Sequence, residues 1–454
     1  MVAVPTGAGP DHLGRLHERL LAPDERKGRG AFYTPPEVAD ELVGWAVRDL
    51  DDPVVCDPAC GGGAFLLAAA RAGVRRLVGI DLDPLAVAVA EASLWLAGAT
   101  AELVEADSLL DPWPEPVDVV VGNPPFLSQL GAATARTRER AATIGASGYV
   151  DDAVLFLSLA VRLARRRVAL LQPESVVSAT SAATVRAEVA AVLQDLWVPD
   201  RSVFADAAVR VVGVLVDRER PSPSPARWVD VLASAHGVPE VGLGGHGVLG
   251  DHATVAAGFR DEYYSLVPLV REAQPGDAPI VTSGLIDPGR LRWGERPARF
   301  GRRRWERPAV DPAHRPAWAV ALGVPKLLVA TQTRVVEAVA DPDGTTVPVT
   351  PVLSVVPDGD LGLAHLLAVL LAPPVTAWAR REAGGAALSS DAVKLSASQL
   401  RQVPLPPAGA AWDEAAEHAE AGEVHLAAAA MTRAYGVDVQ DWWEARLAYG
   451  SRDV

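Results

Sequence analysis

The chain has 454 residues, of which 49% are apolar, and a formal net charge of −15. This length is enough to bury more than one core, so two domains are expected. Two cysteines and no apolar N-terminal run favour a reducing cytoplasm without export. The longest apolar stretches, near 153–161 and 361–372, are too short or too interrupted to span a bilayer. The net charge argues against a general affinity for DNA, so the distribution of charge matters more than its total.

The first recognisable segment runs Gly30-Ala31-Phe32-Tyr33-Thr34-Pro35-Pro36-Glu37-Val38. It reads as a loop that leads into a helix capped at Thr34, with prolines at the first helical positions.

A strand expected at 53–57 ends in Asp57 and meets three consecutive glycines, 61–63, before an Ala- and Leu-rich helix. Glycines at such a turn let a ligand approach the backbone and expose the amides at the helix N-terminus. The spacing is not that of the dinucleotide fingerprint, and the lysine of a phosphate-binding loop is missing. A nucleotide-like ligand without a pyrophosphate is therefore favoured.

Two further strands are expected at 76–81 and 101–104. The first ends in Asp81, and Asp107 follows the second. Each acid alone is more simply a helix N-cap or a solvated turn. Their recurrence at successive strand ends, where ligands bind in open α/β sheets, favours a binding role instead. Asp81 is the candidate for ribose hydroxyls, and Asp107 could accept from an adenine amino group.

The apolar run 117–121 leads into Asn123-Pro124-Pro125-Phe126. Prolines push the preceding residue into an extended conformation, so the Asn123 side chain and the Pro124 carbonyl can point the same way. Two fixed acceptors suit a planar amine, and Phe126 offers a face for stacking. The structural alternative is a strand that ends in a proline turn and a core aromatic.

Further strands are expected at 167–172 and 209–216, and Asp151-Asp152-Ala153 is expected to open the helix before the first of them. Alternation with helical patterns predicts a mostly parallel sheet with helices on both faces. Residues 218–226 read as a linker, and one Ala-rich helix is expected near 414–434.

A basic segment stands out in the second half. Residues 290–334 hold 11 Lys and Arg against three acids, a net of +8. Arginines interleaved with aromatic residues are typical of a phosphate-tracking surface, although a solvated loop is the alternative. Arg302, Arg303, Arg304 and Trp305 are the candidate DNA contacts within it. Arg136, Arg138 and Arg140 form a smaller cluster that reads equally as a lid, a DNA contact or a plain surface loop.

Taken in order, these motifs resemble those of γ-class N6-adenine DNA methyltransferases of the type II or type IIG-like restriction-modification kind. The resemblance is specific over residues 28–126, fair to about 220 and loose beyond. Gly62 departs from the family pattern, in which serine is commoner. Fewer than thirty residues precede the first motif, so no fused nuclease is expected there.

The resemblance implies an α/β fold: a doubly wound, mostly parallel, Rossmann-like S-adenosylmethionine-dependent methyltransferase sheet with a C-terminal mixed α+β target recognition domain. It implies a catalytic domain at 1–220, a linker at 221–246 and a recognition domain at 247–454. Lys326, in a segment similar to a recognition-domain landmark, joins the DNA contacts.

The implied activity is transfer of a methyl group from S-adenosylmethionine to a flipped-out adenine in double-stranded DNA. The catalytic residues implied are Asn123, Pro124, Pro125 and Phe126. The cofactor-binding residues implied are Tyr33, Thr34, Pro35, Asp57, Pro58, Ala59, Gly61, Gly63, Asp81, Asp107 and Asn123. No metal is expected, because Cys56 and Cys60 alone would be an incomplete zinc site.

Two alternatives stay open. The same tetrapeptide in related folds can bind a protein glutamine or a base in RNA, and a chain with this fold could be an inert specificity subunit. The sequence leaves the recognition site open, and also whether a restriction endonuclease or a phage-defence protein accompanies the chain.

Overall fold

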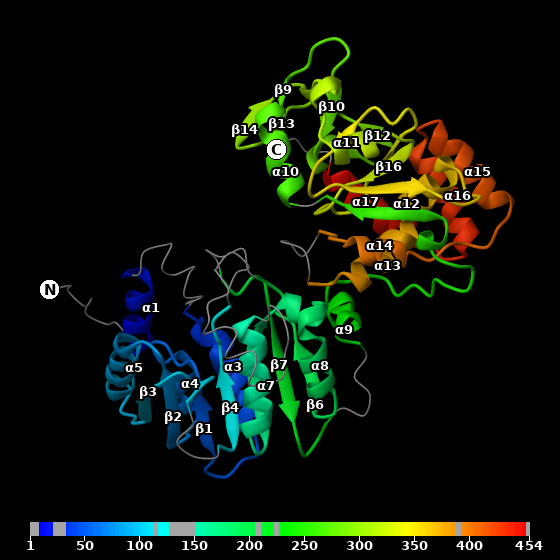
Figure 1. Ribbon diagram of the computed structural model, residues 1–454. Helices are drawn as coiled ribbons and strands as arrows, with labels where there is room; N and C mark the ends of the chain where they lie inside the picture. Colours follow the sequence, from blue (N-terminus) through cyan, green and yellow to red (C-terminus); the bar gives the residue numbers. More distant parts are fainter. Residues whose placement is uncertain are drawn as a thin grey trace. The chain divides into compact units, whose positions relative to one another are not determined.

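The computed structural model describes residues 9–20, 33–111, 117–126, 151–204, 210–221, 227–258, 260–385 and 392–450. The chain divides into two compact units, Met1–Leu232 and Ala233–Val454 (Figure 1). Part of the stretch predicted as a linker is a packed helix, α9 (Trp228–Ala235). Its Trp228, Val229 and Leu232 are buried in a core of the first unit, because an apolar helix face is more stable there than in water.

The first unit is built on one seven-stranded sheet. Its strands are β1 (Val54–Asp57), β2 (Arg76–Asp81), β3 (Glu102–Glu105), β4 (Val119–Gly122), β5 (Arg167–Pro173), β6 (Leu193–Trp197) and β7 (Val211–Asp217). Their order is β3-β2-β1-β4-β5-β7-β6, in which β7 alone runs antiparallel to its neighbours. This confirms the predicted α/β class and mostly parallel sheet. The strand β6 was not predicted, because Gln194 and Asp195 interrupt its apolar pattern.

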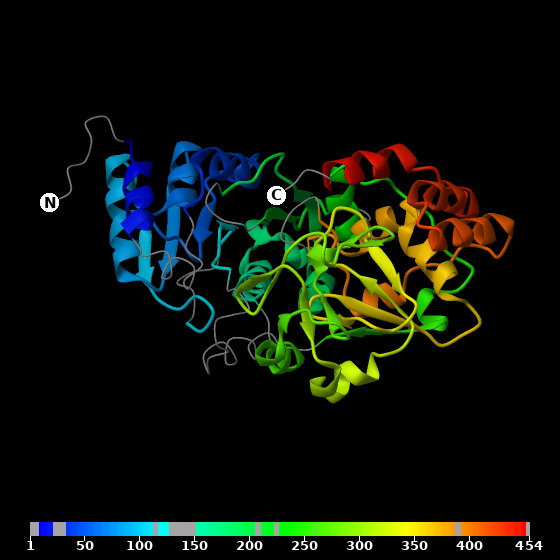
Figure 2. The same ribbon diagram turned by 90° about the horizontal axis from the view of Figure 1, so that it is seen from above.

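Helices cover both faces of this sheet, which explains why β1, β4, β5 and β7 read as continuous apolar runs (Figures 1 and 2). One face packs against α3 (Pro36–Val47), α4 (Ala64–Arg71) and α5 (Pro84–Leu96). The other packs against α7 (Asp152–Leu163) and α8 (Ala183–Ala190). A further helix, α1 (Asp11–Leu20), packs on α5.

The helix starts follow from capping. Asp151 caps α7 as predicted, its Oδ1 accepting from the Ala153 amide at 3.0 Å. The predicted cap at Thr34 is wrong: the N-cap of α3 is Pro35, and no side chain caps the helix there. Pro36 occupies the first helical turn, where a missing N–H leaves no bond unmade.

The second unit combines small sheets with helices. Its larger sheets have the orders β17-β16-β19-β8 and β18-β10-β15-β9, and two hairpins pair β11 with β12 and β13 with β14. The strands are β8 (Ala253–Ala257), β9 (Arg271–Glu272), β10 (Ala278–Val281), β11 (Ile286–Asp287), β12 (Arg290–Leu291), β13 (Ala298–Phe300), β14 (Arg303–Trp305), β15 (Pro308–Val310), β16 (Lys326–Val329), β17 (Ala338–Asp341), β18 (Val347–Pro348) and β19 (Leu353–Pro357). The helices are α10 (Arg260–Leu266), α11 (Ala317–Ala321), α12 (Leu363–Leu371), α13 (Pro373–Glu382), α14 (Ala397–Arg401), α15 (Ala410–Glu420), α16 (Val424–Tyr435) and α17 (Gln440–Gly450). The unit is therefore a mixture of helices and mostly antiparallel strands, with β10 and β18 paired in parallel.

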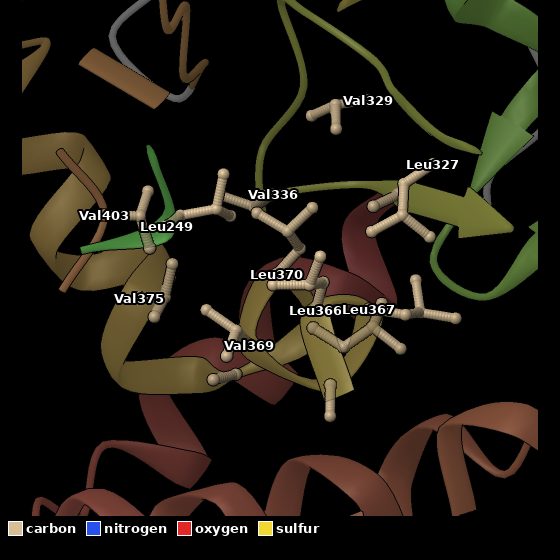
Figure 3. Close-up of a cluster of buried hydrophobic side chains, with 14 of the residues drawn as sticks. Leu249, Leu327, Val329, Val336, Leu366, Leu367, Val369, Leu370, Val375 and Val403 are labelled. Carbon is tan, nitrogen blue, oxygen red and sulfur yellow. The ribbon is translucent and has the colours of Figure 1, made fainter. Parts of the chain in front are cut away.

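The main core of the second unit forms where α12 packs beneath the sheet that contains β16 (Figure 3). Leu366 and Leu370 are fully buried there with Leu327 of β16. The single helix predicted near 414–434 is wrong, because α15 and α16 are separated at Gly422, whose φ of +75° ends the first helix.

Within the described ranges, no single helix is long and apolar enough to cross a membrane. The bent pair α12 and α13 passes on length and composition only, and most of α12 belongs to the core just described.

Candidate active site

The loops that follow β1, β2 and β3 meet at the carboxyl edge of the sheet and are joined by hydrogen bonds. The Cys60 amide donates to the Ile80 carbonyl at 2.9 Å, and the Gly61 amide donates to Asp81 Oδ2 at 2.8 Å. The Ala106 amide donates to the Asp81 carbonyl at 3.0 Å. Asp81 therefore connects the glycine turn after β1 to the loop after β3.

The glycine turn needs its glycines for two different reasons. Gly61 and Gly63 have φ values of +51° and +89°, which side-chain-bearing residues rarely adopt, and Gly63 is the N-cap of α4. Gly62 is required by packing, because a Cβ there would lie 2.6 Å from the Cα of Gly14 in α1. Gly62, where serine is commoner in the family, therefore packs against a second glycine, Gly14 of α1.

The N-terminal motif lies against the same turn. A Cβ at Gly14 would lie 2.3 Å from the ring of Tyr33, so the tyrosine, α1 and the turn are in close contact. The Tyr33 hydroxyl donates to Asp11 Oδ1 at 2.9 Å, and burial together with Asp11 raises the pKa of this hydroxyl. Thr34 is buried and Pro35 is half-buried. The predicted cofactor residues 33–35 are therefore placed beside those of the glycine turn.

Asp57 connects the glycine turn to the tetrapeptide. The residue is 1% exposed, and its Oδ1 accepts from the Ala59 amide at 3.1 Å. A Cβ on Gly122 would lie 2.6 Å from the same Oδ1, so the end of β4 contacts the carboxylate that ends β1. Burial raises the pKa of Asp57 to about 8; the Ala59 amide lowers it and Asp81 raises it further.

Asp81 and Asp107 complete the row of acids. Asp81 Oδ1 accepts from the Asp83 amide at 2.9 Å, and burial raises its pKa even though backbone amides oppose this. Asp107 is buried, and its Oδ1 accepts from the Leu109 amide at 3.2 Å. The neighbouring Ser108 hydroxyl donates to the Pro58 carbonyl at 2.5 Å, which joins the loops after β1 and β3.

Asn123 is the only asparagine in the chain and lies directly after β4, next to β1 in the sheet. Asn123 and Pro125 are half-buried, and Pro124 is buried. Phe126 is 8% exposed and packs in the core beneath α3 and α4. The structure thus brings the tetrapeptide to the same edge as the acids, while stacking by Phe126 stays a prediction that requires its ring to become accessible.

Two residues that the sequence analysis missed hold this edge together. Gly122 permits contact with Asp57, and Ser108 joins two loops. A glycine at the end of an apolar strand is a signal for close backbone approach that could have identified Gly122. Ser108 carries no such signal, because a serine after an acid is common in turns.

The predicted DNA contacts divide into three groups. The prediction that Lys326 contacts DNA is wrong. Lys326 is 0% exposed and its Nζ lies 2.5 Å from Asp341 Oδ2, so its charge is not available to phosphates. Trp305 is half-buried, and its indole N–H donates to the Phe300 carbonyl at 3.0 Å, which braces the hairpin. Arg302, Arg303 and Arg304 are exposed. The cluster at Arg136, Arg138 and Arg140 lies outside the described residues.

The exposed arginines belong to a tight hairpin. Phe300 pairs with Arg303, so Gly301 and Arg302 form a two-residue turn, and both have positive φ, +57° and +62°. The base of the hairpin is fixed because Phe300 is buried and its ring centroid lies 4.6 Å from that of Tyr263. The hairpin is a rigid ribbon with a charged tip.

Other arginines of the basic segment are neutralised. Arg290 and Arg292 pair with Glu295, and Arg292 and Arg296 pair with Asp287. In contrast, no acid among the described residues pairs with Arg299, Arg302 or Arg303. Arg304 Nε lies 3.6 Å from Glu306. Within the described part of this segment, arginines without a close acidic partner thus lie on the β13–β14 hairpin and also include Arg307 just beyond it, over the Trp293 ring.

No group of three or more metal-ligating side chains is found in the described ranges. Cys56 and Cys60 are buried and unbonded, and burial raises the pKa of both thiols.

Comparison with known proteins places the amino-terminal unit. Residues 8–191 match the family model described as N-6 DNA Methylase. Type II methyltransferase M.VspI of Vibrio sp. (strain 343) is 29% identical over 127 residues, 27% of this chain and 31% of that protein. Type II methyltransferase M.MamI of Microbacterium ammoniaphilum is 33% identical over 145 residues, 26% of this chain and 40% of that protein.

Among solved structures, the cryoEM structure of a DrdV–DNA complex is similar to this chain, with 17% sequence identity and a TM-score of 0.39. The match covers 48% of this chain and 30% of the chain in that complex. The chain spans about a third of the length of the curated relatives named above. The family-model match and these relatives agree with the motifs at the sheet edge. Residues 8–191 of this chain are therefore similar to the N-6 DNA methylase family.

Proposed function

We propose that this chain is a site-specific DNA adenine N6-methyltransferase that uses S-adenosylmethionine. The observation that carries the proposal is the contact between the two motifs: Gly122, which precedes Asn123, lies against the Asp57 carboxylate that leads into the glycine turn. A group bound at the turn and an amine bound at Asn123 would then be neighbours. The family match over residues 8–191 supports the same reaction.

The residues at the glycine turn fit this cofactor. A Cβ at Gly61 would meet no atom within 4 Å, so a ligand can approach the backbone there. Among the described residues no cation pairs with Asp57 or Asp81, and burial raises the pKa of both. Buried acids of this kind can form hydrogen bonds with the hydroxyls of a ribose, and in the ionised form they suit the cationic amino-acid end of the cofactor.

When bound, S-adenosylmethionine supplies the methyl group. The chain's own part is to hold the accepting amine in place. The Asn123 side-chain oxygen and the Pro124 carbonyl accept its two hydrogens and stabilise the positive charge that develops on nitrogen. This requires rearrangement near β4, because Asn123 Oδ1 is buried in the present structure.

The β13–β14 hairpin is proposed to contact the DNA backbone. Arg299 and Arg304 lie directly opposite each other in the ribbon, and like charges in this position are unfavourable unless an anion binds between or beside them. A two-stranded ribbon is also narrow enough for the major groove. Arg302 and Arg303 extend the positive charge to the tip.

Double-stranded DNA is thus the proposed substrate. A restriction endonuclease or a phage-defence protein as partner, and a cytoplasmic location, stay predictions that follow from the similarity of residues 8–191 to that family.

The test is to incubate the purified chain with labelled S-adenosylmethionine and DNA, RNA or protein acceptors, and to digest the labelled product to its parts. Label recovered from DNA as N6-methyl-2′-deoxyadenosine is the expected result. Label found only in protein or RNA would assign another substrate, and failure to bind the cofactor would favour the inert subunit. Single-molecule sequencing of DNA from cells that express the chain would also give the recognition sequence.

A further inference from the structure

Gln172 is a buried carboxamide that makes no side-chain hydrogen bond to the described residues. The residue is 0% exposed, and neither its Oε1 nor its Nε2 has a hydrogen-bond partner within the part of the chain that the structure describes. Buried polar side chains nearly always have partners, because burial removes the hydrogen bonds they make with water. A primary amide with both ends unused needs a physical explanation.

The surroundings of Gln172 would suit an apolar side chain. On the same face of the sheet lie Val168 and Leu170 of β5 and Val212 and Val214 of β7, all buried in the core that packs against α7. Gln172 is directly paired with Val212. A leucine of similar size would continue this core, so the amide opposes the local pattern rather than following it. Breaks in a pattern of this kind concentrate at functional sites.

The position of Gln172 links it to the tetrapeptide. Gly122, the last residue of β4, pairs with Leu170 of the parallel strand β5. Two residues further along β5, Gln172 lies on the same face as Leu170 and beyond the last residue of β4 that pairs with this strand. The amide is therefore at the carboxyl edge of the sheet, on the strand next to the one that presents Asn123.

The nearest charged residue along the chain does not explain the amide. Glu174 follows β5 and is 5% exposed, but its Oε1 is bound by Arg210 Nε at 2.9 Å. That ion pair is complete without Gln172.

We propose that Gln172 is a recognition residue that contacts the ring edge of the target base, an inference that rests on the proposed function. If Asn123 and Pro124 accept both hydrogens of the exocyclic amine, the acceptors beside that amine are the ring nitrogens N1 and N7 of adenine. The Nε2 of Gln172 can donate to either. A contact with N7 also excludes cytosine, which carries a C–H on that side of its amine.

The test uses duplex oligonucleotides that carry the recognition sequence, with adenine, 1-deazaadenine or 7-deazaadenine at the target position. Each analogue replaces one ring nitrogen by C–H, which cannot accept a hydrogen bond. Wild type should lose at least fivefold in kcat/KM with one analogue. Gln172→Leu should show a similar loss with adenine and no further loss with that analogue, as a double-mutant cycle requires.

Gln194→Leu, on the strand β6 of the same sheet, is the matched control and should keep the wild-type pattern. Thermal unfolding separates recognition from a structural role. Since leucine replaces an amide without partners, Gln172→Leu should unfold at the wild-type temperature or above, and cofactor binding should be unchanged.

A variant that keeps wild-type discrimination between the three bases would overturn the proposal, as would one that unfolds earlier and loses cofactor binding. Failure of wild type to methylate adenine in any DNA would instead overturn the proposed function, and this inference with it. Methylation by wild type without coupling between Gln172 and either analogue would overturn the inference alone.

Discussion

The buried carboxylates at the carboxyl edge of the first unit's sheet are held differently from Asp341 of the second unit. In the first unit, Asp57 and Asp81 accept hydrogen bonds from backbone amides, and burial raises the pKa of both. In the second unit, burial raises the pKa of Asp341, but Lys326 and Thr346 outweigh this and lower it overall. A buried acid with a raised pKa and no paired cation is a candidate for ligand binding, whereas the Lys326–Asp341 pair is a structural contact.

Glu337 in the second unit departs from this pattern. Burial and the nearby Asp287 raise its pKa to about 8, while Arg296 lowers it. The difference between the units therefore concerns the acids at the carboxyl edge of the sheet, and not every buried acid.

The largest expected effect is at the edge of the sheet. Asn123→Ala should lower kcat for DNA methylation at least about 10²-fold, because it removes an acceptor that stabilises charge on the amine. Cofactor affinity, measured by calorimetry, should stay within a few fold. Asn123→Asp keeps an acceptor and should retain more activity than the alanine variant. Near-wild-type turnover by Asn123→Ala would remove the catalytic assignment.

The next effect tests the charged hairpin. Glutamate at Arg302, Arg303 and Arg304 together should weaken DNA binding and reduce the slope of log K against log salt concentration by about 3 units, since about 0.9 counterions are released per phosphate contact. Fluorescence anisotropy over a salt series measures the slope. Arg290→Gln is the control, because that arginine is already paired with Glu295. An unchanged slope in the triple variant would make the hairpin a solvated loop.

Breaking the Lys326–Asp341 ion pair in the second unit should have the opposite effect, lowering stability without changing the salt dependence of DNA binding. Lys326→Met leaves Asp341 buried without its cation, and breaking such a pair costs about 3 to 5 kcal/mol of the free energy of unfolding. Urea denaturation gives this value. Below the unfolding transition, the salt slope of DNA binding should equal that of wild type, and a reduced slope would mean that Lys326 reaches phosphate after all.

The smallest effect is a pH dependence. Asp57, with a pKa of about 8, is mostly protonated at pH 6 and becomes ionised as the pH rises to 8. A cationic ligand favours the ionised form, so cofactor affinity should increase with pH over this range, by at most about tenfold per unit. Asp57→Asn cannot ionise and should show weaker binding with a flatter profile. Equal slopes for both proteins would exclude Asp57 as the titrating group.

Much of the first unit was predictable, because a parallel sheet leaves clear signals. Buried strands read as apolar runs, and the residues that bind ligands follow them at their carboxyl ends. The resemblance to N6-adenine methylases was predicted from the same motifs, and the family-model match over residues 8–191 agrees with it. The positions of Asp57, Asp81 and Asn123 on one edge followed from this rule, whereas the contact of Gly122 with Asp57 depends on three-dimensional approach that spacing alone does not give.

The second unit was less predictable, because its strands are short and its charges pair across the chain. Lys326 reads as a free cation in the sequence, but its partner Asp341 lies fifteen residues away on the neighbouring strand. Likewise Arg292 and Arg296 read as part of a basic surface until Asp287 is seen beside them. A linear count of charges cannot separate paired from unpaired arginines.

The contact between Gly14 and Gly62 has a consequence for how ligand binding at the glycine turn could be measured. Two backbones without side chains meet there, so α1 has no compliant atoms between itself and the turn that would receive the cofactor. Any shift of that turn must be transmitted to α1 as a whole. We therefore expect cofactor binding at the turn to change the amide exchange rates of residues 11–20, which can be measured without following methyl transfer.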